Sequence, residues 1–148
     1  MADATYQPKV YRKQGSDELV IAAGGKITQE DGGAYVSPVE VVTDDFTVTA
    51  AESGKIFIVN AADVTATLPS TAAGLTYTFI VQTLSTTTGL SISPAAADAI
   101  HGGGQASTDN KDLINTAATD AEGDMVTIVG DGVDGWWITS IVGTWAEE

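Results

Sequence analysis

The sequence predicts an all-β protein: an antiparallel β-sandwich or barrel preceded by an extended N-terminal arm and a short glycine-punctuated β-segment. Three observations lead to this class. Apolar and polar residues alternate with a period of two in many short runs. Gly, Pro and Asp separate these runs roughly every 8–15 residues, and no segment has the 3.6-residue period of an amphipathic helix. A chain of 148 residues can form one such domain, and without cysteine its core depends on packing and hydrogen bonds.

The first domain that we predict, residues 1–16, is an extended arm that docks on a partner. The segment is polar, and Tyr6 and Tyr11 are aromatic side chains of the kind that anchor protein interfaces. Several bases lie between and after these tyrosines. The residues that we expect to make the contact are Tyr6, Pro8, Lys9, Tyr11, Arg12 and Lys13.

The second predicted domain, residues 17–43, is a short β-hairpin or β-arc. Leu19, Val20 and Ile21 form a strand-like run, and glycine pairs follow at 24–25 and 32–33, eight residues apart. Such spacing is typical of short strands joined by tight turns that need a positive φ. Pro38 interrupts the pattern, and residues 39–43 resume it.

The third predicted domain, residues 44–148, is the body. Thr, Val, Ile and aromatic residues at period two suit a half-buried pleated sheet. The expected strands lie at residues 46–50, 55–60, 64–68, 75–81 and 90–92. We expect residues 95–121 to form a long surface loop, because they contain the 102–104 glycine triplet; a short helical turn at 95–99 is the alternative.

The clearest local feature is an antiparallel hairpin near the C-terminus. Residues 125–129 and 136–142 are β-rich runs, joined by a Gly/Asp loop at 130–135. The loop matches the Gly-x-Gly-x-x-Gly fingerprint of dinucleotide-binding proteins by its letters. That fingerprint requires a helix after the glycines, and here a Trp-Trp strand follows, so we interpret the segment as a turn.

The charge of the chain is large and unevenly distributed. The net charge is −14, which disfavours nucleic acid and anionic membrane surfaces as partners. The first 26 residues hold four bases and three acids, a net charge of +1, whereas residues 27–148 hold two lysines and 17 acids, a net charge of −15. The chain lacks a secretory signal and any stretch of 18 apolar residues, so we expect a soluble protein that is not processed.

Catalytic and metal-binding patterns are few. His101 is the only histidine, which excludes histidine pairs, and we expect it to lie in a loop facing solvent or a neighbouring subunit. The acids at 120–124 and 131–134 offer oxygen ligands for calcium but lack the EF-hand order, and acid–glycine turns form for conformational reasons alone. We therefore predict no catalytic residue, no metal site, no cofactor and no enzymatic activity.

The opening residues 4–12, Ala-Thr-Tyr-Gln-Pro-Lys-Val-Tyr-Arg, followed by glycine-punctuated strands, resemble the small head decoration (cement) proteins of tailed bacteriophages. Residues 51–60, 68–69, 73–75 and 79–81, and the closing Trp-Trp-Ile…Gly-Thr-Trp pattern, are similar to a β-module of phage virion proteins. The resemblance implies a virion protein, made in the host cytoplasm, that binds the major capsid protein on the outer capsid surface. It also implies a homotrimer that locks neighbouring capsomers together.

An alternative function remains open from the sequence. The chain could be a phage tail or fibre β-module that binds cell-surface glycan, because exposed tryptophans stack on sugar rings. The residues for this role are Trp136, Trp137 and Trp145.

Overall fold

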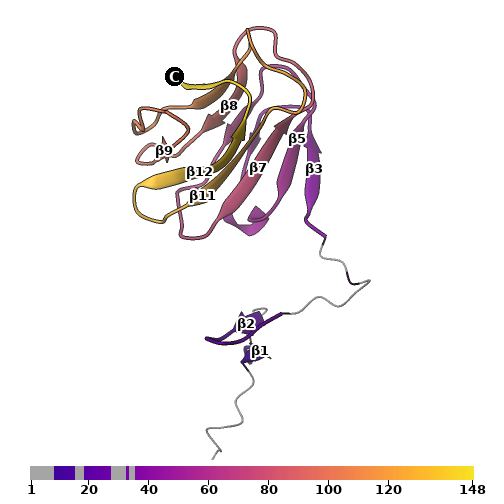
Figure 1. The fold of residues 1–148 in the computed structure, drawn as a ribbon, viewed down its shortest axis with the longest axis vertical. Helices are drawn as coiled ribbons and strands as arrows, with labels where there is room; N and C mark the ends of the chain where they lie inside the picture. The colour runs from indigo at the N-terminus through magenta and orange to yellow at the C-terminus, as the bar shows by residue number, and fades with distance from the viewer. Residues whose placement is uncertain (1–8, 16–18, 28–32, 34–35) are drawn as a thin grey trace, which may run out of the picture. The chain divides into compact units, whose positions relative to one another are not determined.

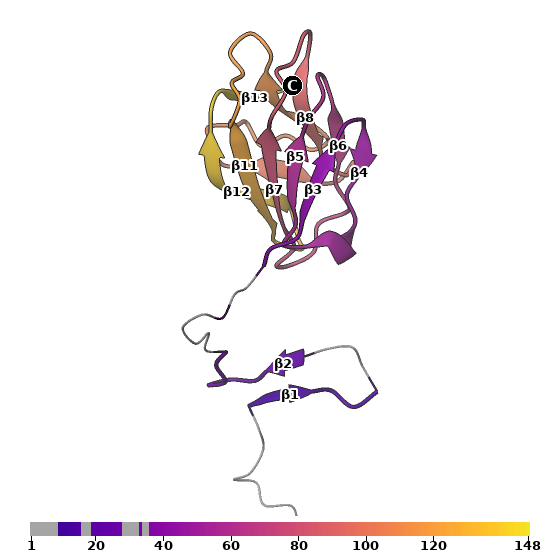
Figure 2. The ribbon, with the colours of Figure 1, turned by 90° about the vertical axis from the view of Figure 1, so that its right-hand side faces the viewer.

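The computed structural model describes residues 9–15, 19–27, 33 and 36–148, and it divides into two compact units, Met1–Val36 and Ser37–Glu148. Figures 1 and 2 trace both units from two directions. The first unit contains a two-stranded hairpin, and the second contains two larger sheets.

The second unit is a β-sandwich, which confirms the predicted fold class (Figure 2). The six-stranded sheet has the order β3 (Val39–Val42), β5 (Ile56–Val59), β7 (Thr76–Val81), β11 (Met125–Gly130), β12 (Gly135–Val142) and β9 (Ala99–His101). The five-stranded sheet has the order β13 (Trp145–Glu147), β10 (Leu113–Thr116), β8 (Gly89–Ser93), β6 (Thr65–Thr67) and β4 (Phe46–Thr47). One 3₁₀ turn, η1 (Ala50–Glu52), replaces the end of the strand expected at 46–50.

The sheets are mixed, whereas the alternation had predicted antiparallel ones. Antiparallel pairing joins β7, β11 and β12 in one sheet and β8, β10 and β13 in the other. Parallel pairing joins β3 to β5 to β7, β4 to β6 to β8, and β9 to β12. From β3 to β11 each strand lies in the other sheet from the strand before it. Between β3 and β8 the chain crosses to the opposite sheet and returns running the same way, so neighbours in one sheet are parallel. After β8 this pattern ends, because β10 returns from β9 antiparallel to β8.

The core lies between the two sheets and is rich in aromatic side chains. Phe57 and Phe79 stack with ring centroids 5.5 Å apart, and Phe46 packs on Phe57 at 5.0 Å. Tyr77 and Trp136, both fully buried, pack at 5.5 Å. Strand β7 shows how the sequence supplies this core, because its alternate residues face inward and are buried, whereas the residues between them face outward and are not. Alternation therefore sets which face of each strand enters the core.

The expectation of a long surface loop at residues 95–121 is wrong. The segment contributes β9 and β10, and it buries Ala99, Ile100, Leu113 and Asn115. Each strand is only three or four residues long. Such short strands do not show a clear alternation of apolar and polar residues in the sequence. The polar residue Asn115 at an inward position obscures the pattern further.

The two predicted domain boundaries differ from the division in the structure. The boundary after residue 16 falls inside a hairpin, because β1 (Val10–Arg12) pairs with β2 (Leu19–Ile21). The boundary after residue 43 separates β3 from its own sheet, because β3 pairs along its whole length with β5. Hydrogen bonding between strands, which the sequence does not display, decides both cases.

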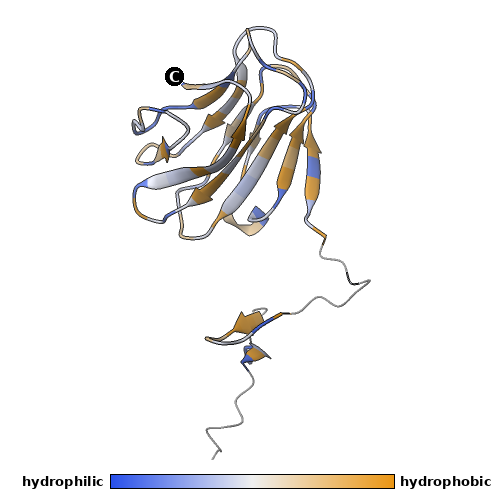
Figure 3. Ribbon diagram, viewed as in Figure 1, coloured by the Kyte–Doolittle hydropathy of each residue, from blue (hydrophilic) through white to orange (hydrophobic). Residues whose placement is uncertain are grey.

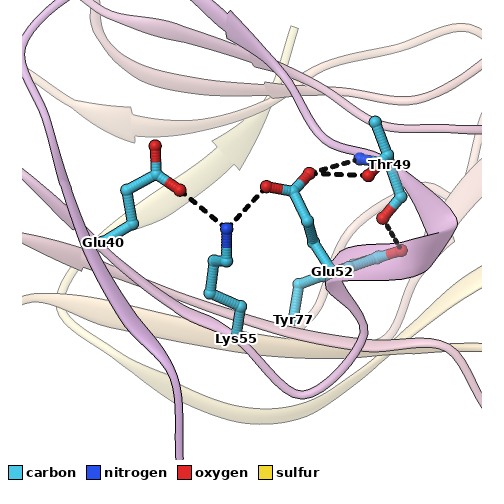
Figure 4. A network of polar contacts seen from close by, with 5 residues as sticks. All are labelled: Glu40, Thr49, Glu52, Lys55 and Tyr77. Atoms are coloured by element: carbon cyan, nitrogen blue, oxygen red, sulfur yellow. Dashed lines mark hydrogen bonds and ion pairs between the residues drawn. The ribbon is translucent and has the colours of Figure 1, made fainter.

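A polar network ties edge strand β3 to the turn η1 (Figure 4). The Nζ atom of Lys55 lies 2.7 Å from a carboxylate oxygen of Glu40 and 2.6 Å from one of Glu52. The other oxygen of Glu52 accepts hydrogen bonds from the backbone N–H and hydroxyl of Thr49, both 2.8 Å. These contacts, the Lys55 hydrogen bond foremost, hold the pKa of Glu52 below its usual value of 4.5. The hydroxyl of Tyr77 donates to the Thr49 carbonyl at 3.0 Å, which joins the network to the core.

A candidate docking hairpin

Strands β1 and β2 form an antiparallel ribbon in the first unit. Val10 lies opposite Ile21, Tyr11 opposite Val20, and Arg12 opposite Leu19. Residues directly opposite each other share a face of a sheet. Tyr11 and Val20 therefore lie on one face, and the other two pairs lie on the opposite face.

The chain after β2 turns in close contact with the backbone next to β1, and this turn requires glycines. The backbone N–H of Ala22 donates to the Lys9 carbonyl at 2.7 Å, and Gly25 N–H donates to the Ala22 carbonyl at 2.7 Å. A Cβ on Gly25 would lie 2.6 Å from the Lys9 carbonyl oxygen. Gly24 has a φ of +76°, which an L-residue with a side chain rarely adopts. The Gly24–Gly25 pair thus permits a turn that no other pair of residues accommodates as easily.

The hairpin combines exposed apolar side chains with positive charge. Tyr11, Leu19, Ile21 and Ile27 are between 42% and 62% exposed. Residues 9–27 hold four bases and two acids, a net charge of +2, and all four bases are exposed: Lys9, Arg12, Lys13 and Lys26. Residues 37–148, by contrast, hold 15 acids and two lysines, a net charge of −13. Clusters of large exposed apolar residues often mark protein-binding surfaces, and arginine is enriched in such surfaces.

The hairpin is a sheet of two strands. Within the described residues, β1 and β2 pair as strands with each other. A two-stranded hairpin is marginally stable in water on its own, so contact with a partner would stabilise it.

The structure places four of the six predicted contact residues, and Tyr6 and Pro8 lie outside the described residues. Lys9, Tyr11, Arg12 and Lys13 are all exposed and lie on or beside β1. Residues 10–12 are paired in a hairpin instead of forming a free extended arm, because Leu19–Ile21 supplies a complementary strand.

The sequence reasoning missed the apolar half of the hairpin surface. Leu19, Ile21 and Ile27 are exposed, although an apolar run normally indicates a covered strand. The one available signal was the shortage of other apolar residues in the first 36 positions with which this run could pack.

His101 lies on strand β9 and not in a loop. Its ring stacks on Trp137 with centroids 4.7 Å apart, and its Nε2 atom is buried without a hydrogen-bond partner. Trp137 is 48% exposed and donates from Nε1 to Asp131 at 2.9 Å. Trp136 and Trp145 are buried, so the three tryptophans do not form one exposed platform.

In the acidic clusters at 120–124 and 131–134, carboxylates accept hydrogen bonds from the backbone of the turns in which they lie. A carboxylate oxygen of Asp131 accepts the backbone N–H groups of residues 133, 134 and 135, and these bonds hold the pKa of Asp131 far below its usual range. The buried carboxylate of Asp124 accepts from Asn115 Nδ2 and Ala121 N–H, both at 3.0 Å. Over the described part of the chain, no three His, Asp or Glu side chains are grouped as metal ligands.

Comparison of the sequence with protein-family models and with curated proteins found no match. Within the described ranges, no helix has the length and apolar character needed to cross a membrane.

Proposed function

We propose that this chain is a non-enzymatic structural protein of a bacteriophage virion, which binds the outer surface of the assembled capsid and links neighbouring capsomers. The observation that carries the proposal is the β1–β2 hairpin, a cationic and partly apolar ribbon that belongs to a different compact unit from the sandwich. The resemblance of residues 4–12 to phage decoration proteins supplies the identity of the partner.

The chemistry of the hairpin supports docking on a protein. Tyr11 offers a flat aromatic contact, and Arg12 offers a guanidinium that pairs with carboxylates in bidentate geometry. Cationic residues favour an acidic patch on the capsid, and binding is expected to weaken as salt increases.

The acidic sandwich supports the same role. Its net charge of −13 keeps it from phosphate backbones and repels neighbouring particles. The hairpin would then attach the chain, while the sandwich remains exposed to water.

The test is co-sedimentation of the full chain with capsids purified from phage that lack this gene. The double variant Tyr11→Ala/Arg12→Ala should raise the dissociation constant at least about tenfold, as expected for loss of an aromatic and an arginine anchor. The control Lys111→Ala removes a surface cation of the sandwich, which pairs with Glu148 at 3.6 Å, and should bind like the wild type.

Two results would contradict the proposal. Wild-type protein that stays in the supernatant with these capsids would exclude a capsid-binding role. Equal binding by Tyr11→Ala/Arg12→Ala and the wild type would exclude the hairpin as the contact. A melting temperature of the double variant within about 2 °C of the wild type shows that the sandwich is intact.

A further inference from the structure

The outer face of the six-stranded sheet carries a continuous apolar row that crosses five strands. The cross-strand registers place Val41 beside Ile58, Ile58 beside Ile80, Ile80 beside Met125, and Met125 beside Val142. All five side chains point away from the core, because the alternate positions on the same strands are the buried ones. Val41 and Val142, at the two ends of the row, are 56% and 51% exposed.

The same face lacks charge at its neighbouring outward positions. The adjacent row consists of Val39, Ile56, Thr78, Thr127 and Ser140. No outward position in either row is Asp, Glu, Lys or Arg, although the chain has 20 acids. Figure 3 shows the apolar colour along β5 and β11, whose inward and outward positions are both mostly apolar. Strands that are apolar at every position are typical of sheets covered on both faces.

The five-stranded sheet provides an internal comparison. Its large apolar residue facing outward on β10 is Ile114, whereas its outward positions on β4, β6 and β8 are hydroxyl residues: Thr47, Thr65, Thr67, Ser91 and Ser93. These residues are normal for a sheet face in contact with water. The apolar character of the six-stranded face is therefore a property of that sheet and not of the whole surface.

We propose that the outer face of the six-stranded sheet is a self-association surface, on which a second copy of this chain packs sheet against sheet. Charge supports this occupant. Two sandwiches, each with a net charge of −13, repel each other wherever their acids come close. They can approach only through a face without charge, and this face meets that requirement on both copies at once.

The symmetry of the contact predicts the number of copies, and its area predicts the strength of the association. A single flat patch that packs on its own copy gives a two-fold dimer, in contrast with the trimer that the resemblance implied. Five strands about 4.8 Å apart and two side-chain rows about 6.7 Å apart give about 320 Å² per copy. This area is below the roughly 800 Å² per partner of a stable complex, so we expect a weak dimer that dissociates on dilution.

The experiment is sedimentation velocity of the full chain from about 5 to about 500 μM, a range chosen for a weak interface. Wild-type protein should shift from monomer to dimer across this range. Raising NaCl from about 50 to about 500 mM shortens the Debye length from about 14 to about 4 Å, so it should tighten the dimer at least about threefold. This measurement needs no capsid, so it succeeds or fails independently of the proposed function.

Two variants test the position of the interface. Ile80→Glu places a charge at the centre of the row, and Val41→Glu places one at an exposed end, where folding tolerates it. Each should raise the dimer dissociation constant at least about tenfold, because a buried unpaired carboxylate is costly. The matched control Thr67→Glu adds the same charge to the exposed outer face of the five-stranded sheet and should leave the dimer intact.

Each contrary outcome overturns the proposal. A wild type that stays monomeric at the highest concentration excludes self-association. A dimer that survives Val41→Glu and Ile80→Glu, or one that Thr67→Glu disrupts equally, places the contact elsewhere. A trimer as the associated species excludes two-fold packing of this face.

Discussion

Asn115→Asp tests how the buried polar pair between the sheets is held. Asn115 is fully buried on β10, and its Nδ2 atom donates to Asp124 at 3.0 Å and to the Thr144 carbonyl at 3.2 Å. Asp124 is itself only 6% exposed. The substitution replaces the donor with a second carboxyl oxygen at hydrogen-bond distance from the first. Two carboxylates so close in a buried site cannot both ionise, so the folded variant must retain a proton.

The loss of folding free energy depends on how far the pH lies above the pKa that the protonated carboxyl has in the unfolded chain. A carboxyl in the unfolded chain has a pKa of about 4, and each pH unit above it costs about 1.4 kcal/mol, so retaining the proton at pH 7 costs about 4 kcal/mol. Loss of the hydrogen bond to Thr144 adds about 1 kcal/mol. The folded variant binds more protons than the unfolded chain, so its stability decreases as pH rises, and the proton-linked deficit disappears near about pH 4.

Urea unfolding followed by tryptophan fluorescence at pH 7, 5.5 and 4 measures the deficit. A total of about 5 kcal/mol is comparable to the whole stability of many domains, so the variant should be largely unfolded at pH 7 and recover most of its stability at pH 4. Asn115→Ala is the control. It loses the same donor without adding a carboxyl, so its deficit should change by less than about 1.4 kcal/mol over this range. An Asn115→Asp deficit that is equal at pH 7 and pH 4 would refute the reasoning.

Two further predictions concern the Glu52–Lys55 network and the tryptophans. Because its hydrogen bond from Lys55 lowers the pKa of Glu52, Glu52 stabilises the fold above pH 4.5, and this contribution is lost as pH falls through the lowered pKa. Glu52→Gln should therefore lower the unfolding free energy by about 1 kcal/mol at pH 7 and by much less at pH 3, and equal urea midpoints of variant and wild type at pH 7 would contradict this. Trp137→Phe should remove most acrylamide-quenchable fluorescence, since Trp136 and Trp145 are buried; unchanged quenching would mean that another indole is exposed.

The fold class was predictable because alternation reports directly which side of a strand is buried. Residues 75–81 and 125–129 alternate over enough positions for both strands to be identified, and the turn at 130–135 carries the glycines that a tight reversal needs. Strand partners were not predictable in the same way. The residues of β5 are compatible with parallel or antiparallel neighbours, and the choice depends on the chain crossing between the sheets.

The candidate hairpin was predictable only in part, for a related reason. Bases and tyrosines near the N-terminus are visible in the sequence, so Lys9, Tyr11, Arg12 and Lys13 could be predicted as candidate contact residues, and the structure shows that they are exposed. Exposure of Leu19 and Ile21 depends on the absence of a covering layer within the first unit, and a sequence does not state what is missing from around a strand. For the same reason, the sequence could not show that the outward face of β5 is uncovered, because Ile58 would be apolar in either case.

The hairpin and the outer sheet face suit different kinds of contact. The hairpin presents exposed cations, which favour an acidic partner, and their attraction to it should weaken in salt. The outer sheet face is uncharged and apolar, so its association should strengthen in salt. A chain with both surfaces can attach to a larger particle through one and contact its neighbours through the other. Attachment would raise the local concentration of copies, and a face of about 320 Å², too small to hold a dimer in dilute solution, would then become effective.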